Sequence, residues 1–169
     1  MEKESVFKKI QRIGNIGSFQ FNASNNFMEF SQELRFIFGF QDSITLNTME
    51  TWIDIIHPKD KEIMEQYFRE SIINQNLFRK ESRIIRKNDG EIRWVEGWGE
   101  IIFDDQANEL SMIGVIQDIT DRKLALEKIQ NAEIRSHRIF ESSKEGILIL
   151  DAITGKITDA NPANVKALT

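Results

Sequence analysis

Two histidines and no cysteine leave few residues in this chain of 169 that could perform catalysis. His57 precedes Pro58 and has the side chain of a haem ligand or a general base. His137 could accept a phosphoryl group, but that chemistry needs an acidic neighbour, whereas Arg138 follows it. No group of histidines and carboxylates has the spacing of a metal site, and no Ser, His and Asp combine into a nucleophilic triad. The sequence therefore predicts no catalytic and no metal site, and we expect this fragment not to be an enzyme.

Composition excludes several further classes of function. The absence of cysteine rules out disulfides, thiolate metal sites and cysteinyl cofactor adducts. The pair of glycines in Gly14-Asn15-Ile16-Gly17 is interpreted as a turn, because no Lys-Ser/Thr pair follows and a strand pattern comes next. A net charge of −5 without a stripe of Lys and Arg argues against nucleic acid. No apolar run approaches the ~18 residues of a membrane helix. We expect no membrane insertion and a cytoplasmic location, in a parent protein that could itself be membrane-anchored.

Residues 77–120 carry the clearest pattern, in which apolar and polar residues alternate between turn-forming segments. The pattern predicts three consecutive antiparallel strands. We place them at 77–87, 91–103 and 110–119, with a turn at 88–90 and a longer connection at 104–108. In the middle strand, a period of two puts uncharged residues on one face: Val95, Gly97, Gly99, Ile101 and Phe103. We expect helices to shelter Trp94 and Trp98 on the other face, because two exposed indoles would leave a large apolar area in water.

The residues before this stretch predict two more strands and several helices. A short amphipathic helix over 5–13 is a candidate to cover Trp94 or Trp98, with apolar residues at helical spacing: Val6, Phe7, Ile10 and Ile13. Short strands and further helices are expected in the order 18–22, 26–30, 31–39, 48–56 and 60–73. This order predicts an α+β fold, a five-stranded antiparallel sheet with its helices inserted between strands two and three and with flanking helices at both ends.

Several short motifs then occur in a characteristic order: Ile16-Gly17-Ser18-Phe19, Phe38-Gly39-Phe40, Trp52 through His57-Pro58 and Asp60, Glu81-Ser82-Arg83-Ile84, Asp89-Gly90, Arg93-Trp94-Val95, and Gly114 through Asp118-Ile119-Thr120. Together they resemble the motifs of PAS sensor domains, in the subgroup with Arg-Trp-Val and Asp-Ile-Thr signatures. The resemblance covers residues 14–120. It implies a PAS fold and a sensory or protein-interaction module without catalysis of its own, placed before a histidine kinase of a two-component system, a cyclase or a transcription regulator.

The resemblance also assigns roles to particular residues. His57-Pro58 becomes a helix junction, which favours a capping role for the histidine. Asp118, Ile119 and Thr120 become the exit motif, where the last strand passes into a signalling helix. This is physically reasonable, because Asp118 or Thr120 can cap the free N–H groups of a helix that starts at Asp121. We therefore divide the chain into an N-terminal helix (1–13), a PAS domain (14–120), a linker helix (121–140) and the start of a second, truncated PAS domain (141–169).

The linker helix at 121–140 contains no Gly or Pro. A heptad frame passes through Ile119, Leu126, Ile129, Ser136 and Phe140, with Glu133 in an inward position. We expect a homodimer through Leu126, Ile129 and Phe140, the alternatives being a helix that lies on its own sheet or a free linker. The segment after it has the features of a second such domain, with Glu145-Gly146-Ile147 leading a strand and Asn161-Pro162-Ala163 opening a helix. So short a segment cannot build a core alone.

The sequence does not identify a ligand for this domain. The flavin chemistry of related light sensors needs a cysteine, and the position of their flavin-contacting Gln is occupied here by Ile116. Haem would need an axial ligand in the long helix, and 60–73 contains no His. Flavin and haem are therefore not expected, which leaves no cofactor or an unknown small molecule. Candidate pocket residues are Val95, Gly97, Gly99, Ile101, Met112, Gly114 and Ile116. The main hypothesis is a module that senses a ligand or partner and signals to a downstream domain of the same chain; the alternative is a cofactor-free interaction and dimerisation module.

Overall fold

The computed structural model describes residues 2–40, 48–104 and 109–163. The chain divides into two compact units, Met1–Asp121 and Arg122–Thr169, which are described separately below. The predicted connection at 104–108 lies almost wholly outside the described residues.

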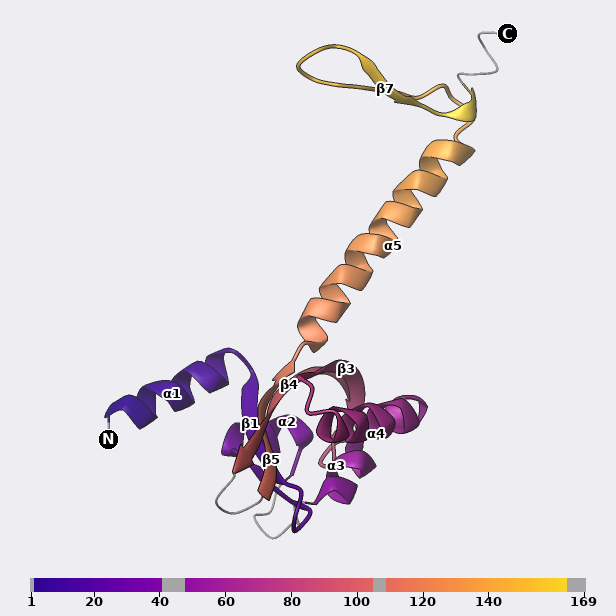
Figure 1. Ribbon diagram of the computed structural model, residues 1–169. Helices are drawn as coiled ribbons and strands as arrows, with labels where there is room; N and C mark the ends of the chain where they lie inside the picture. The colour runs from indigo at the N-terminus through magenta and orange to yellow at the C-terminus, as the bar shows by residue number, and fades with distance from the viewer. Residues whose placement is uncertain (1, 41–47, 105–108, 164–169) are drawn as a thin grey trace. The chain divides into compact units, whose positions relative to one another are not determined.

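Unit 1 consists of an antiparallel five-stranded sheet and four helices (Figure 1). Its elements are α1 (Glu2–Ile13), β1 (Ile16–Asn22), β2 (Phe27–Phe30), α2 (Gln32–Phe38), α3 (Met49–Ile55), α4 (Pro58–Ile73), β3 (Phe78–Ile85), β4 (Ile92–Asp104) and β5 (Glu109–Asp118). The strands lie in the order β2-β1-β5-β4-β3, and every neighbouring pair is antiparallel. Helices α2, α3 and α4 are inserted between the second and third strands, which confirms the predicted fold class.

The core lies between one face of this sheet and helices α2, α3 and α4. Phe68 of α4 is at its centre and is 1 % exposed. Its ring centroid lies 4.9 Å from that of Trp52, 5.4 Å from that of Phe21 and 5.6 Å from that of Phe78. Edge-on and tilted aromatic pairs at these separations are favourable beyond the area they bury. One aromatic cluster thus joins α3, α4, β1 and β3.

The helices begin and end where local capping residues allow it. Ser31 precedes α2, and its side chain accepts a hydrogen bond from the backbone N–H of Leu34. Gly39 ends α2 with φ of 74°, a left-handed conformation that glycine adopts without steric cost. His57 caps α4 by accepting a hydrogen bond at Nδ1 from Lys59 N–H, and Pro58 occupies the first helical position. The structure thus gives His57 a capping role.

The environment of the two tryptophans on β4 differs from the prediction. In the described part of unit 1, arginine side chains of β3, rather than the expected helices, lie over the two indole rings. The guanidinium of Arg83 lies 5.4 Å from the ring centroid of Trp94, and that of Arg79 lies 5.9 Å from that of Trp98. A guanidinium can stack on an indole while its own edge stays hydrated, so half-buried tryptophans on a sheet do not require a helix. Phe103 continues the apolar face of β4 two residues beyond Ile101, but it is 49 % exposed, so the core covers that face only in part.

Helix α5 (Thr120–Ser142) begins in unit 1 and forms most of the described part of unit 2. It is followed by a two-stranded antiparallel sheet of β6 (Leu148–Leu150) and β7 (Ile157–Ala160). None of the described side chains of α5 is buried.

Candidate functional site

The seven candidate pocket residues come together on the inner face of β4 and β5. Their register pairs are Gly97 with Ile116, Gly99 with Gly114, and Ile101 with Met112, while Val95 pairs with Asp118. Val95, Met112 and Ile116 are 0 to 6 % exposed, and Ile101 packs against the margin of the core. The alternation pattern therefore placed these residues on a common face, as expected.

The three glycines of this face are surrounded by protein atoms rather than by empty space. A Cβ on Gly114 would lie 2.2 Å from the carbonyl oxygen of Trp98 and 2.6 Å from the ring of Phe19. A Cβ on Gly99 would lie 2.9 Å from the sulfur of Met112, and one on Gly97 would lie 3.0 Å from the ring of Phe78. The glycines let core side chains of β1, β3 and β5 approach the sheet, at positions that the sequence had assigned to a ligand pocket.

A small internal cavity lies beside these glycines. Its volume is about 10 Å³, and it is lined by Phe19, Met28, Phe30, Trp52, Phe68, Phe78 and Ile116. A cavity needs about 10–15 Å³ to accommodate one water molecule. Between the described side chains, this part of the inner face therefore has no room for an organic ligand unless aromatic rings move.

The exit motif is bonded tightly to β4. Asp118 Oδ1 accepts hydrogen bonds from the Thr120 backbone N–H at 2.9 Å and from its hydroxyl at 2.6 Å. The Thr120 hydroxyl oxygen in turn accepts from the backbone N–H of Trp94 at 2.9 Å. The backbone N–H of Ile119 donates to the Trp94 carbonyl at 2.8 Å, and the Ile119 side chain is 3 % exposed. The first residue of α5 is thus attached to the backbone of a central strand.

A second set of contacts leads from α4 to the same tryptophan. Asp60 accepts hydrogen bonds from the Arg83 guanidinium and from the Arg83 backbone N–H, the latter at 2.9 Å. The Arg83 hydrogen bond lowers the pKa of Asp60 below its ordinary value, against an opposing effect of burial, and the same bond raises the pKa of Arg83. Because Arg83 also stacks on Trp94, contacts run without a break from α4 through β3 to the residue that holds Thr120.

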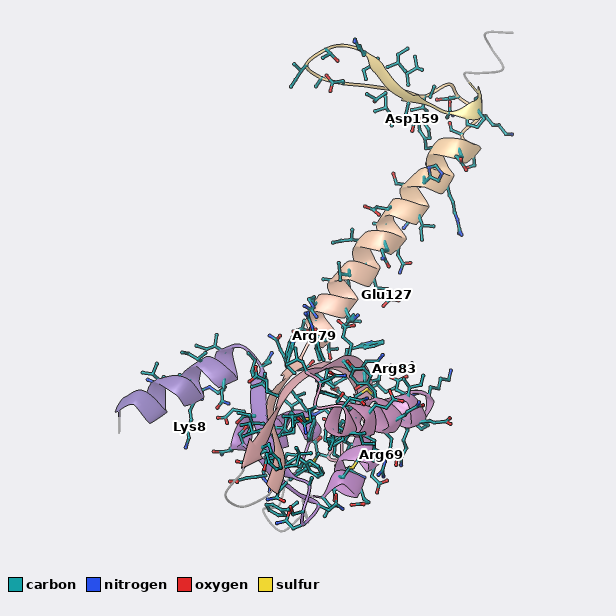
Figure 2. All side chains as sticks on the ribbon, viewed as in Figure 1. Lys8, Arg69, Arg79, Arg83, Glu127 and Asp159 are labelled. Atoms are coloured by element: carbon teal, nitrogen blue, oxygen red, sulfur yellow. The ribbon has the colours of Figure 1, made fainter. Side chains whose placement is uncertain are left out.

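The sequence analysis did not predict that Arg83 lies over Trp94, although both residues belong to recognised motifs. The signal that could have found it is the hairpin register. A turn at 87–90, one residue longer than the predicted turn at 88–90, places Arg83 opposite Trp94 and Arg79 opposite Trp98, which is the register observed. The predicted turn would have placed Arg83 opposite Val95. Figure 2 shows the two arginines on β3.

The candidate dimer residues lie on α5 in different environments. Leu126 and Ile129 are 51 % and 56 % exposed, whereas Phe140 is half-buried. Ile119 precedes the helix and is buried in unit 1, so the heptad frame drawn through it cannot use that position. This part of the prediction was wrong, because the exit motif folds the residue into the domain.

Unit 2 repeats two hydrogen-bonding devices of unit 1. Asn161 and Ile147 exchange bonds, with Ile147 N–H donating to Asn161 Oδ1 at 2.8 Å and Asn161 N–H donating to the Ile147 carbonyl at 3.1 Å. Ser31 and Ser18 exchange the same two bonds at 3.0 and 2.9 Å. In both units this pair joins the start of the first strand to the residue directly after the second strand.

The second shared device is a turn closed by an acidic or amide side chain at the end of the first strand. Asn22 Oδ1 accepts from the backbone N–H groups two and three residues later, and Asp151 Oδ1 does the same. The bonds from Ile153 and Thr154 lower the pKa of Asp151. The two units therefore share two hydrogen-bonding arrangements at corresponding places along the chain.

No group of three or more His, Cys, Asp or Glu in the described ranges has the arrangement of a metal site. No helix within those ranges is both long enough and apolar enough to span a membrane.

Comparison with known proteins gives a consistent result. The sequence model of the PAS fold family matches residues 27–116. The chain is 24 % identical over 153 residues to the probable diguanylate cyclase DgcE of Escherichia coli K12. This alignment covers 90 % of the chain but only 14 % of that protein, so the chain spans about one seventh of the length of its relative.

Solved structures share the fold at low sequence identity. One is a sensory box histidine kinase/response regulator from Burkholderia thailandensis, with a TM-score of 0.62 and 20 % identity over 78 % of this chain and 98 % of that one. Another is the N-terminal domain of a diguanylate cyclase with a PAS/PAC sensor from Marinobacter aquaeolei, with a TM-score of 0.58 and 17 % identity over 64 % of this chain and 98 % of that one.

Proposed function

Because the chain belongs to the PAS fold family, whose model matches more than half of its residues, we propose that it is a sensory module that passes its state through α5 to a downstream output domain of the same protein. The hydrogen-bonded attachment of Thr120 to Trp94 and Asp118 carries the proposal. A change at β4 would shift the first residue of α5 directly. The output domain is a histidine kinase or a cyclase, the classes found among the similar proteins.

The stimulus is a partner contact at the surface rather than a cofactor held in the core. The filled space beside Gly97, Gly99 and Gly114 supports this assignment, as does the size of the cavity. A partner shifts the module only if it binds one arrangement of sheet and helix more tightly than the other. The competing function is a sensor of a small apolar ligand, which would have to displace core aromatic rings to enter.

The domain layout proposed from the sequence fits these roles. We assign residues 1–13 to an N-terminal helical segment, 14–120 to the sensor domain, 121–140 to the linker helix and 141–169 to the start of a second PAS domain. The paired bonds of Asn161 and Ile147, which match those of Ser31 and Ser18, support the last assignment. We also propose that the protein is a homodimer through Leu126 and Ile129 of α5. We propose, too, that the protein lies in the cytoplasm.

Removal of the Asp118 carboxylate tests the transmission step. In an Asp118→Ala variant, Thr120 loses two hydrogen bonds, so the first turn of α5 should exchange its amide protons with solvent about tenfold faster or more, the equivalent of ~1.4 kcal/mol. Asp121→Ala is the matched control, since this exposed aspartate also lies in the first turn. Equal exchange in the two variants, measured by hydrogen–deuterium exchange mass spectrometry, would refute the role of the exit motif.

A further inference from the structure

The end of α1 and the start of α5 lie at the same place in unit 1. Helix α1 ends at Ile13 and β1 begins at Ile16, whereas β5 ends at Asp118, two residues before α5 begins. The strands β1 and β5 are antiparallel neighbours, with Ile16 opposite Gln117 (Figure 1). The chain therefore enters the sheet from α1 beside the point where it leaves for α5, although Gly14 and Gln117 are 103 residues apart in the sequence.

Two hydrogen bonds join the end of β5 to the residues that follow α1. The side-chain Nε2 of Gln117 donates to the carbonyl of Gly14 at 3.0 Å, and the backbone N–H of Asp118 donates to the carbonyl of Asn15 at 2.9 Å. Gly14 also continues the hydrogen bonding of α1, because its backbone N–H donates to the Ile10 carbonyl at 2.9 Å. A displacement of the last turn of α1 therefore moves the two carbonyls that β5 holds.

The backbone of Asn15 sets the direction of this connection. Its φ is 49°, in the left-handed region, which asparagine adopts more readily than most residues and which often ends a helix. Its side chain is exposed, so we attribute its role to the backbone. The left-handed residue turns the chain out of α1 and into β1, which brings its carbonyl to Asp118.

Asp118 carries hydrogen bonds in both directions. Its backbone N–H is bonded to Asn15, and its carboxylate accepts the two bonds from Thr120 described above. A shift of the Asp118 backbone therefore carries the carboxylate with it and moves the first residue of α5. None of the seven candidate pocket residues takes part in these bonds, so this route from α1 to α5 needs no ligand in the core.

We propose that α1 is the element that receives the stimulus, and that Asn15 and Gln117 pass its position to Asp118 and so to α5. This inference rests on the proposed function, in which the exit motif transmits the state, and it names the route by which the stimulus enters. The last turn of α1 is attached to β1 as well, because Gln11 is buried and its Nε2 donates to the hydroxyl of Ser18 at 3.3 Å. A partner that binds one position of α1 more tightly than another changes both bonds to β5.

Hydrogen–deuterium exchange of the full chain tests this route with two changes at one position. Asn15→Val places a β-branched residue at a positive φ, which such residues rarely adopt, and should make the first turn of α5 exchange about fivefold faster or more. Asn15→Gly accepts the left-handed conformation and should keep the exchange of that turn close to its original rate. Asn26→Val is the matched control, because Asn26 also has a positive φ, of 57°, but lies in the turn between β1 and β2. It should leave the first turn of α5 unchanged.

A second variant removes one of the two bonds without straining the backbone. Gln117→Leu loses the donor to Gly14 and should also speed exchange in the first turn of α5. Because coupling between two sites is reciprocal, Asp118→Ala should in turn make the amides of Gly14 and Asn15 exchange faster. A merely structural role of Gln117 would loosen the end of α1 and leave α5 as it was.

The outcomes separate this route from the transmission step itself. The route is refuted if Asn15→Val and Gln117→Leu leave the first turn of α5 as Asn26→Val does, while Asp118→Ala loosens it; the exit motif then stands and the stimulus enters elsewhere. If Asp118→Ala acts only as its control Asp121→Ala does, the exit motif fails and the route from α1 fails with it.

Discussion

Asp60 and Arg83 show how one ion pair can serve both stability and communication. Arg83 holds Asp60 through its side chain and its backbone, and its guanidinium lies over the ring of Trp94. Both partners are mostly buried, with 19 % and 28 % of their side chains exposed. Breaking such a pair therefore costs more than breaking an exposed one, and it also removes the support for the Trp94 ring.

The lowered pKa of Asp60 predicts a pH dependence of stability. A carboxylate with a depressed pKa in the folded state stabilises it above the unfolded pKa of ~3.9 and loses this effect as the pH falls through the folded value. Asp60→Asn should lower the free energy of unfolding by about 1 kcal/mol at pH 7. The difference from the unchanged protein should shrink below pH ~4. Urea unfolding at pH 7 and pH 3 measures both, with Asp54→Asn, in an exposed pair with Lys61, as the control. A difference that stays constant over this range would contradict the assignment.

At the scale of elements, the sheet could be predicted because alternation and turn residues act over short distances along the chain. The sequence placed Val95, Gly97 and Gly99 on one face, and the structure agrees. The arginine–tryptophan stacks were missed because they depend on the register of β3 against β4. The occupants of the glycine gaps were missed because Phe19 comes from β1, far away in the sequence, and because no local pattern states which side chain of the neighbouring strand β3, such as Phe78, fills a gap.

The packing at β4 and β5 predicts how the two strands tolerate alanine. Gly114→Ala forces a methyl group against the Trp98 carbonyl, which cannot move without the strand, so we expect a loss of about 2–3 kcal/mol. Gly97→Ala should cost less, because its nearest neighbour is the Phe78 ring at 3.0 Å, a side chain that can adjust. Thermal unfolding of the two variants gives the comparison. If the glycines instead line space for a ligand, both alanines should be tolerated equally.

At the scale of the whole molecule, the two ends of α5 are attached to different parts of the chain. Its first residue is bonded to the sheet of unit 1, while the carbonyl of Ser143, just past its end, accepts a bond from Asn161 of unit 2. Leu126 and Ile129 lie between these attachments, on the part of the helix that neither bond involves. A dimer seam restricted to these middle turns could join two copies without disturbing either attachment, whereas Phe140 is half-buried and is less available for it.

Native mass spectrometry of the full chain tests the seam and the filled core together. We expect a dimer at the bare mass of two chains, because the cavity beside the glycines is too small for an organic ligand. Leu126→Glu/Ile129→Glu should shift the population toward monomer, since it places four like charges in the seam of a dimer. Leu124→Glu/Ile134→Glu, equally exposed on the same helix but outside the predicted seam, is the matched control. Equal loss of dimer in both variants would contradict the assigned seam. A dimer that retains extra mass under mild activation would instead favour the ligand sensor, with the rings of Phe19 and Phe78 displaced to admit the ligand.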